Sequence, residues 1–165
     1  MKNLYLIGGT MGVGKTTTCQ VMKRKLNNSV FLDGDWCWDM DPFIVNEETK
    51  EMVIENICFL LNNFIQCSAY ENIVFCWVMH EQKIIDDILA KLKTENCNLH
   101  LISLVCNRKA LRDRLEIDVE NGIRTTNSIN RSLERVELYK NLKTDKVDVS
   151  EISPIEVADY IILNC

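Results

Sequence analysis

The sequence of 165 residues predicts a single α/β domain whose parallel sheet lies between two layers of helices. Two observations lead to this prediction. Short apolar runs alternate along the chain with segments whose apolar residues recur at helical spacing. The run over residues 72–79 is apolar almost without interruption, as expected of a parallel strand that is covered on both faces. Ligands of such domains bind beyond the C-terminal strand ends, so the polar residues there are candidates for a site.

The first element is an apolar strand over residues 4–7 that runs into a glycine-rich loop. The loop fits the pattern G-x-x-x-x-G-K-[ST], with a strand before it and a helix after it. Glycines let backbone amides turn toward a phosphate, and the following helix directs its positive end at the same anion. A plain glycine turn beside a surface lysine is the alternative. The expected nucleotide-binding residues are Gly9, Thr10, Met11, Gly12, Val13, Gly14, Lys15, Thr16 and Thr17.

Two side chains of this loop have expected chemical roles. Lys15 should reach the β- and γ-phosphates of a nucleotide, and the Thr16 hydroxyl should bind Mg²⁺. The loop therefore predicts a phosphate-bearing nucleotide with Mg²⁺.

The next elements follow from periodicity. A helix is expected over residues 17–26, with its apolar residues on one side. Residues 30–32 form a short apolar strand that ends in an Asp-Gly-Asp triplet at 33–35. The stripe of apolar residues over 47–69 predicts one long helix or two shorter ones.

The second half of the chain continues the alternation. After the strand over 72–79 we expect a helix over 81–93, a strand over 98–106, a helix over 108–117, a polar stretch over 118–126, a helix over 128–141 and a strand over 146–148. Ser153 and Pro154 open a terminal helix, because serine caps a helix start and proline suits its first position.

Charge, apolar runs and cysteine spacing argue against nucleic acid, a membrane and zinc as partners. The net charge is −5, whereas a protein that mainly binds nucleic acid normally presents a basic face. No apolar run approaches the roughly 20 residues that span a membrane, and no signal peptide precedes the first strand. The eight cysteines form no C-x-x-C pair, and only two histidines could join them at a zinc site. We expect a cytoplasmic monomer or weak homodimer with reduced thiols, no membrane contact and no nucleic-acid partner.

These features together resemble the small P-loop kinases that phosphorylate metabolites, a group that includes shikimate kinase, gluconate kinase and chloramphenicol phosphotransferase. The resemblance covers nearly the whole chain. It rests on the loop, the 33–35 triplet, residues 111–115 before an arginine-bearing stretch, and residues 147–150 with the Ser-Pro pair near the end. It implies a P-loop NTPase fold with a five-stranded parallel sheet of order 2-3-1-4-5, one domain over residues 1–165, and a small lid at about 117–127. It also implies ATP and Mg²⁺ as the cofactors.

The resemblance also implies roles for two carboxylates. Asp35 resembles the group that accepts or orients the proton of the acceptor hydroxyl, and Asp33 resembles the group that holds the Mg²⁺ shell. A hydroxyl attacking phosphorus needs a positioned proton acceptor, so the assignment is chemically sound. A turn that ends the strand is the alternative explanation of the triplet.

Two arginines complete the implied site. Arg114 resembles the arginine that packs over adenine or reaches its phosphates, and Arg124 resembles the lid arginine that closes on the transferred phosphoryl group. The expected catalytic set is Lys15, Asp35 and Arg124, and the expected metal ligands are Thr16 and Asp33. The roles of four further arginines stay open: Arg108, Arg112, Arg131 and Arg135.

The third strand departs from the pattern of many P-loop enzymes, because His80 follows it where an acidic residue is usual. Either Asp33 takes over the metal, or catalysis is weakened. His80 could contact substrate or simply be a hydrogen-bonded surface residue. An apolar wall beside Asp35 is expected from Trp36, Trp38, Trp77 and Met79, which would suit a ring-bearing acceptor; core packing is the alternative for Trp77.

The expected function is transfer of the γ-phosphate of ATP to a hydroxyl of a small-molecule acceptor. The alternatives among enzymes are a nucleoside or nucleotide kinase and a polynucleotide 5′-hydroxyl kinase, the latter disfavoured by the net charge of −5. The alternative that is not a phosphotransferase is a nucleotide-binding switch, which hydrolyses its nucleotide slowly and has no acceptor.

Overall fold

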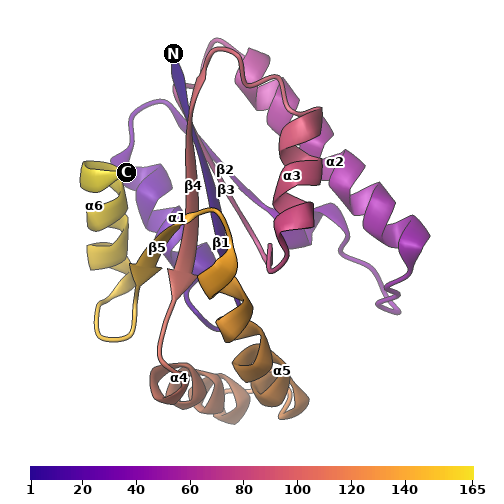
Figure 1. The fold of residues 1–165 in the computed structure, drawn as a ribbon, viewed down its shortest axis with the longest axis vertical. Helices are drawn as coiled ribbons and strands as arrows, with labels where there is room; N and C mark the ends of the chain where they lie inside the picture. The colour runs from indigo at the N-terminus through magenta and orange to yellow at the C-terminus, as the bar shows by residue number, and fades with distance from the viewer.

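Five parallel strands form the centre of the computed structural model, which describes residues 1–165 (Figure 1). The strands are β1 (Lys2–Gly9), β2 (Ser29–Asp33), β3 (Asn72–Trp77), β4 (Cys97–Val105) and β5 (Asp145–Asp148). Their order across the sheet is β2-β3-β1-β4-β5, and every neighbouring pair is parallel. The predicted fold class and strand order are therefore confirmed.

Helices cover both faces of the sheet (Figure 1). One face carries α1 (Lys15–Lys25) and α6 (Pro154–Asn164), and the other carries α2 (Glu47–Gln66) and α3 (Gln82–Lys91). Beyond the C-terminal strand ends lie α4 (Arg108–Glu120) and α5 (Asn127–Arg135). Two short 3₁₀ helices, η1 (Gly34–Cys37) and η2 (Val136–Asn141), complete the fold.

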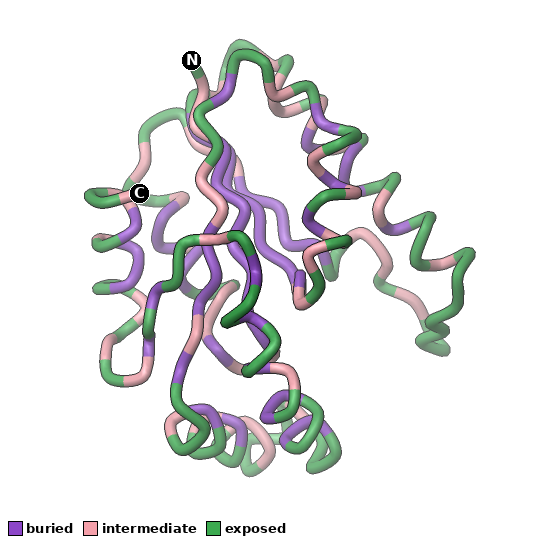
Figure 2. Tube along the Cα trace, viewed as in Figure 1, coloured by how far each residue is buried: buried purple, intermediate pink, exposed green.

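Each face of the sheet has its own hydrophobic core, and β1 contributes to both. Successive side chains of a strand point to opposite faces. Tyr5 and Ile7 accordingly join the core beneath α1 and α6, whereas Leu4 and Leu6 join the core beneath α2 and α3. The strands form the continuous buried centre of Figure 2. This rigid double-sided packing holds the strand ends, where the polar residues gather.

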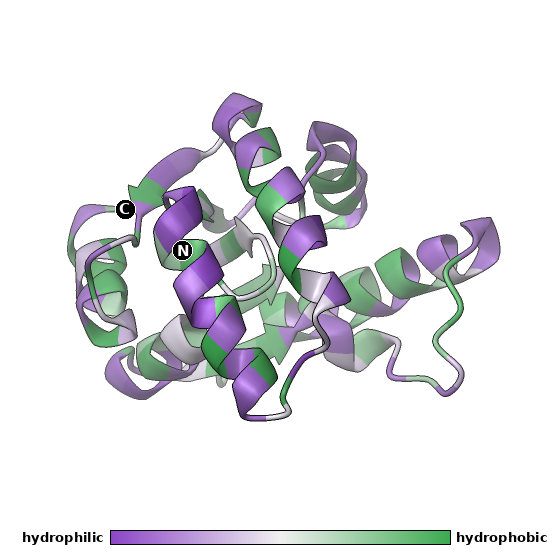
Figure 3. Cartoon of the chain, turned by 90° about the horizontal axis from the view of Figure 1, so that it is seen from below, coloured by the Kyte–Doolittle hydropathy of each residue, from purple (hydrophilic) through white to green (hydrophobic).

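The register of the strands decides which residues meet at those ends. Gly8 of β1 lies opposite Trp77 of β3, and Asp33 of β2 lies opposite Cys76. The ends of the three strands are thus nearly level. The loop after β1 and the triplet after β2 consequently open on the same edge of the sheet. Figure 3 views the chain from below, at right angles to Figure 1.

The largest differences from the expected helices occur in three places. The 47–69 segment is a single helix that ends at Gln66, and α4 continues three residues beyond the expected end at Ile117. The continuation is local, since the amide of Asn121 still donates to the Ile117 carbonyl and residues 118–120 contain no helix breaker. The 128–141 segment is α5 followed by η2, so it is not one α-helix.

Two helices start with reciprocal caps. Asn46 and Thr49 exchange hydrogen bonds at the start of α2, and Ser153 and Glu156 do so at the start of α6. The predicted Ser-Pro start of the terminal helix is confirmed. None of the helices combines the length and the apolarity that crossing a lipid bilayer requires.

Candidate active site

A cleft of about 1420 Å³ opens at the C-terminal ends of the strands. Its floor is the loop between β1 and α1 together with the end of β2. Its walls come from the starts of α2 and α3 on one side and from α4, the following loop and α5 on the other. Predicted residues from distant parts of the sequence meet in it: Lys15, Thr16, Asp33, Asp35, Arg114 and Arg124.

The loop requires glycine at two positions. Gly12 has φ +83° and Gly14 has φ +100°, a left-handed conformation that side chains with a Cβ disfavour. A Cβ on Gly12 would also lie 2.5 Å from Leu115 Cδ2, which α4 packs against the loop. The two glycines predicted to shape the loop therefore do so.

The predicted nucleotide-binding residues divide into two groups. Those that line the cleft are Met11, Gly12, Gly14, Lys15, Thr16 and Thr17. The side chains of Thr10 and Val13 are buried behind the loop, and the Thr10 hydroxyl donates to the Ser132 carbonyl of α5 at 3.2 Å. Gly9 lies behind it as well, where a Cβ would come within 2.7 Å of Val13 Cγ1. These three residues could contact a ligand only through their backbone.

Lys15 lies folded over the loop. Its ammonium donates to the Thr10 carbonyl at 3.1 Å. Enclosure by the loop lowers the pKa of Lys15, and the carboxylates of Asp35 and Asp33 act in the opposite direction. The structure thus holds a desolvated cation beside two carboxylates at the floor of the cleft.

Asp33 is nearly buried and bonded on both oxygens. The Thr16 hydroxyl donates to Oδ2 at 2.7 Å, and the Cys76 thiol lies 3.6 Å from the same oxygen. Oδ1 accepts the backbone amide of Asp35 at 3.1 Å, which caps η1. The two predicted metal ligands, Thr16 and Asp33, are therefore direct neighbours. The contact with Cys76 was not foreseen, because only the β2-β3 register reveals it.

Asp35 faces the cleft one residue into η1. The indole Nε1–H of Trp77 donates to its Oδ1 at 3.1 Å. Desolvation raises the pKa of Asp35 and the neighbouring charge of Asp33 raises it further, whereas Lys15 and the Trp77 hydrogen bond lower it. Gly34 makes this arrangement possible, since a Cβ there would lie 2.5 Å from Trp77 Cγ. Sequence reasoning missed the role of Gly34.

The aromatic wall forms only in part. Trp38 lines the cleft and makes edge-to-face contacts with Trp77 at 5.7 Å and with Phe43 at 5.1 Å between ring centroids. Trp36 is 57% exposed and packs on Phe31 outside the cleft, because η1 turns it away from the strand ends. Placing Trp36 in the wall was therefore wrong.

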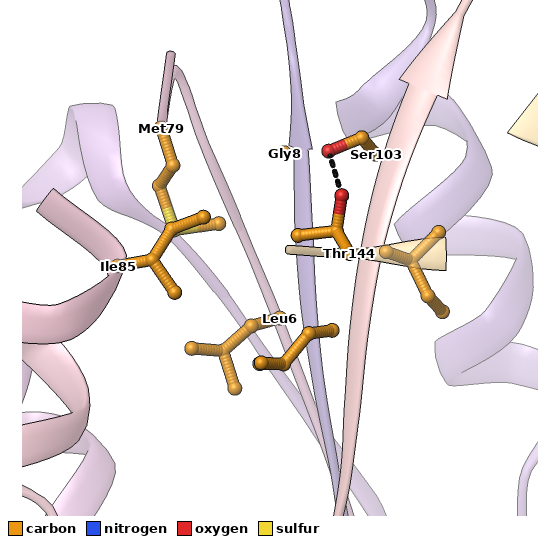
Figure 4. Close-up of a pocket in the computed structure, with 8 residues that line it drawn as sticks. Leu6, Gly8, Met79, Ile85, Ser103 and Thr144 are labelled. Carbon is orange, nitrogen blue, oxygen red and sulfur yellow. Dashed lines mark hydrogen bonds between the residues drawn. The ribbon is translucent and has the colours of Figure 1, made fainter. Parts of the chain in front are cut away.

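Met79 was also misplaced in that wall. It is buried in the core, where it points with Ile85 into a second, smaller hollow (Figure 4). That hollow has no room for a water molecule. The hydroxyls of Ser103 and Thr144 share a hydrogen bond of 2.7 Å. The hollow is packing and not a binding site.

The two predicted arginines already have partners. Arg124 Nε donates to Asp118 Oδ2 at 2.8 Å, and both side chains face the cleft. Arg114 donates to the carbonyls of Val149 and Ser150, and it lies 3.5 Å from that of Val13. Arg114 thus ties the phosphate loop to the loop after β5.

The open residues are now placed. Arg131 and Arg135 line the cleft, whereas Arg108 donates to the Leu133 carbonyl and Arg112 lies along α4 beside Glu116. His80 also lines the cleft, with its Nδ1 3.1 Å from the Val78 carbonyl.

Comparison with known proteins identifies the family. A family described as an AAA domain matches residues 6–137, which is most of the chain. The chain belongs to this family. The matched part of the AAA domain holds the phosphate loop, both aspartates and both arginines of the predicted site. A comparison with curated proteins finds no match.

Solved structures share the architecture of this AAA domain. A tunicamycin resistance protein of Deinococcus radiodurans has a TM-score of 0.75 at 17% identity, covering 99% of this chain and 95% of its own. A gluconokinase of Sinorhizobium meliloti has a TM-score of 0.72 at 15% identity, covering 98% and 90%. A shikimate kinase of Aquifex aeolicus has a TM-score of 0.60 at 16% identity, covering 97% and 94%. At these identities the likeness shows a shared fold of the P-loop kinase type.

The third strand of this AAA domain ends without a carboxylate. Its last residues are Cys76 and Trp77, and His80 follows Trp77 by three positions. Asp33, from the neighbouring strand, lies directly beside Cys76. The only carboxylate in contact with Thr16 therefore comes from β2.

Proposed function

We propose that the protein is an ATP-dependent phosphotransferase that moves the γ-phosphate of ATP to a hydroxyl of a small-molecule acceptor. One observation carries the proposal: the phosphate loop brings Lys15 and Thr16 into the same cleft as Asp33 and Asp35. The chemistry of phosphoryl transfer needs a phosphate cradle, a metal ligand and a proton acceptor close together. The kinase-type fold of the structural neighbours agrees with this proposal.

The loop binds the phosphates of the nucleotide. The backbone amides around Gly12 and Gly14, together with the start of α1, offer hydrogen bonds and a positive dipole. Lys15 exchanges its bond to the Thr10 carbonyl for a phosphate oxygen. Its desolvated ammonium interacts more strongly with developing charge than an exposed one would.

The donor set beside the loop fits Mg²⁺. The hydroxyl of Thr16 and the carboxylate of Asp33 are oxygen ligands, which this cation prefers, and they lie 2.7 Å apart. Bound there, Mg²⁺ would neutralise charge on the β- and γ-phosphates. The Cys76 thiol and the Asp35 amide hold the Asp33 carboxylate in orientation.

Asp35 prepares the acceptor for attack. The Trp77 indole donates to its Oδ1, and the carboxylate has further lone pairs that can accept the proton of the acceptor hydroxyl. The acceptor oxygen then bonds to the γ-phosphorus, the bond from that phosphorus to the bridging oxygen breaks, and ADP leaves with the electron pair. A raised pKa makes Asp35 a better proton acceptor than an ordinary aspartate.

Arg124 supplies charge to the transferred group. In the structure it is neutralised by Asp118 at the edge of the cleft. Release from this pair lets its guanidinium bind phosphoryl oxygens, a task suited to its planar donor geometry. Arg114, joined to both loops around the nucleotide, positions the base or its phosphates.

The test of this function is ADP formation from MgATP with and without a panel of alcohols. A phosphotransferase gains ADP production with the right acceptor, and the acceptor acquires one phosphate. A switch hydrolyses at the same slow rate throughout. The missing acidic residue after β3 is what favours the switch as the second candidate. Uniform, unstimulated hydrolysis across a broad panel of alcohols would favour it over transfer.

The cysteines support a cytoplasmic location. All eight are free thiols, and five of them are buried in the two cores. Free thiols persist in a reducing compartment.

MgATP should raise the melting temperature of the protein. A ligand that binds only the folded state stabilises it by about 2.7 kcal/mol at a hundredfold excess over Kd. For a domain of this size the increase is about 5–10 °C. Differential scanning fluorimetry measures it, with AMP as the control because AMP lacks the two phosphates that the loop binds. A shift no larger with MgATP than with AMP would contradict the assignment of the loop.

Replacing Trp77 with phenylalanine should move the acidic limb of the pH profile of kcat/KM to higher pH. The indole hydrogen bond lowers the pKa of Asp35, so its loss raises that pKa further. Asp35 must be ionised to accept a proton, and activity therefore falls at a higher pH in the variant. Trp36→Phe is the matched control, since Trp36 lies outside the cleft. An unmoved limb in Trp77→Phe speaks against Asp35 as the proton acceptor.

A further inference from the structure

The proposed function leaves the acceptor unnamed, and the side of the cleft opposite α5 carries information about it. We call this side the acceptor wall. It consists of Trp38, Asp39 and Phe43 before α2, and of Glu47, Glu51 and Ile54 on α2. The three residues of α2 are spaced at i, i+4 and i+7, so they lie along one face of that helix. Asn56 donates to the Cys37 carbonyl at 2.9 Å, which holds the segment bearing Trp38 against α2.

Both lysines on this side are paired with a carboxylate. Lys50 lies 2.9 Å from Glu47, and Lys83 of α3 lies 2.5 Å from Asp87. Both pairs are internal to one helix, so each cancels its own charge. The acceptor side therefore has no unpaired cation that could hold an acidic substrate.

Two carboxylates of the acceptor wall are unpaired. Asp39 and Glu51 face the cleft with neither an ion-pair partner nor a side-chain hydrogen bond. Every other carboxylate of the cleft has a partner: Asp33 with Thr16, Asp35 with Trp77, Glu47 with Lys50, Glu81 with His80, Asp87 with Lys83 and Asp118 with Arg124. The wall thus presents a net negative charge to whatever lies beside Asp35.

Arg131 and Arg135 of the cleft lie on the opposite side, next to the phosphate loop. Ser132 of α5 accepts a hydrogen bond from Thr10 of the phosphate loop at 3.2 Å. Arg131 and Arg135 flank Ser132 on the same helix and line the cleft. Their charge therefore lies beside the phosphate loop, and the cleft is divided into a basic side at that loop and an acidic side at the acceptor wall.

The acceptor wall is also aromatic. Trp38 contacts both Phe43 and Trp77 edge to face, and Trp77 holds Asp35. Phe43 is 60% exposed, so this surface is open to a ligand. Aromatic rings bind apolar rings and also attract cations. A positively charged group with a ring would satisfy both features of the wall.

We propose that the acceptor is a ring-bearing alcohol that carries an ammonium group. Its hydroxyl meets Asp35, its ring packs on Trp38 and Phe43, and its ammonium pairs with Asp39 and Glu51. This inference rests on the proposed function. An acceptor that is a carboxylic acid or a phosphate ester is disfavoured, because it would face two unpaired carboxylates.

Three probes that share a phenyl ring and a benzylic hydroxyl test the proposal: 2-amino-1-phenylethanol, 1-phenyl-1,2-ethanediol and mandelate. They are cationic, neutral and anionic at pH 7. Binding of each to the protein with MgADP is measured by titration calorimetry. The expected order of affinity is amine, then diol, then mandelate. Each wall carboxylate that faces the charged group of the probe should change the affinity roughly threefold. Mandelate binding as tightly as the amine, or no binding of the amine, would overturn the proposal.

Charge-removing variants locate the effect. Asp39→Asn and Glu51→Gln should each weaken the amine about threefold, and the double variant roughly tenfold, while the diol is unaffected. Glu55→Gln is the matched control, since Glu55 is on α2 but pairs with Lys91 at 3.8 Å outside the cleft. Equal losses for amine and diol would overturn the charge argument. MgATP stabilisation measured on the same samples tests the proposed function separately, and a mandelate-preferring enzyme would leave that function standing.

Discussion

Replacing Lys15 with alanine should reduce nucleotide turnover by at least about 10²-fold. Removal of a single donor that stabilises charge in the transition state typically costs 10²–10³-fold, and Lys15 is the only cation of the loop. The ammonium is desolvated in the structure, which strengthens its interaction with the γ-phosphate. Steady-state ADP production at saturating MgATP measures the loss.

The same substitution should not unfold the protein. Enclosure lowers the pKa of Lys15, so the charged ammonium is disfavoured in the folded state. Removing the ammonium relieves this cost, and the melting temperature without ligand should not fall. Lys23→Ala is the matched control, because Lys23 is on α1 but does not line the cleft. Turnover in Lys15→Ala equal to that in Lys23→Ala would refute the assignment of the loop as the catalytic phosphate site.

Replacing Asp35 with asparagine should depress kcat while leaving the affinity for ATP nearly intact. Loss of a general base typically costs about 10²–10⁴-fold, and asparagine keeps the shape of the side chain but cannot take the proton. The nucleotide is held by the loop, with which Asp35 shares no hydrogen bond. Titrations of ATP and of the acceptor separate the effect on kcat from the effect on binding.

Replacing Asp33 with asparagine should have a different effect, on the Mg²⁺ requirement and on the pH profile. Its carboxylate lies 2.7 Å from the Thr16 hydroxyl, so the variant should need more Mg²⁺ for half-maximal rate. The charge of Asp33 also raises the pKa of Asp35, and its removal should move the acidic limb of kcat/KM to lower pH, opposite to Trp77→Phe.

Asp41→Asn is the matched control for both variants, since Asp41 lies on the same connection but outside the cleft. Equal and mild effects of Asp33→Asn and Asp35→Asn would mean that the triplet is only a turn. The proton acceptor would then have to be Asp39, the remaining cleft carboxylate of that segment.

The fold could be predicted almost completely because its determinants are local or topological. Apolar periodicity predicted the strands and helices, and the resemblance to the small P-loop kinases implied the sheet order that the structure has. The errors lie at the ends of helices, as with α4, which continues through Asp118, Val119 and Glu120. Charged residues at 118 and 120 do not end the helix, because Val119 packs against the core and the Asn121 amide still donates to the Ile117 carbonyl.

The sequence predicted which residues line the site better than it predicted how their side chains are paired. Lys15, Thr16, Asp33, Asp35, Arg114 and Arg124 do meet in one cleft. The pairing of Arg124 with Asp118 and the contacts of Arg114 with the loop after β5 were not foreseen. Trp36 and Met79 were placed wrongly, since the direction of a side chain depends on the 3₁₀ turn and on core packing that spacing does not reveal.

The sequence by itself determined the phosphate loop, because its glycines, lysine and threonine act through spacing along a single strand, loop and helix. Only the tertiary structure decided how Asp33 and Asp35 are held. The register of β2 against β3 sets Cys76 beside Asp33, and the space over Gly34 admits the indole that bonds Asp35. These contacts join residues more than 40 positions apart, and their geometry follows from how the strands pair and not from any local pattern.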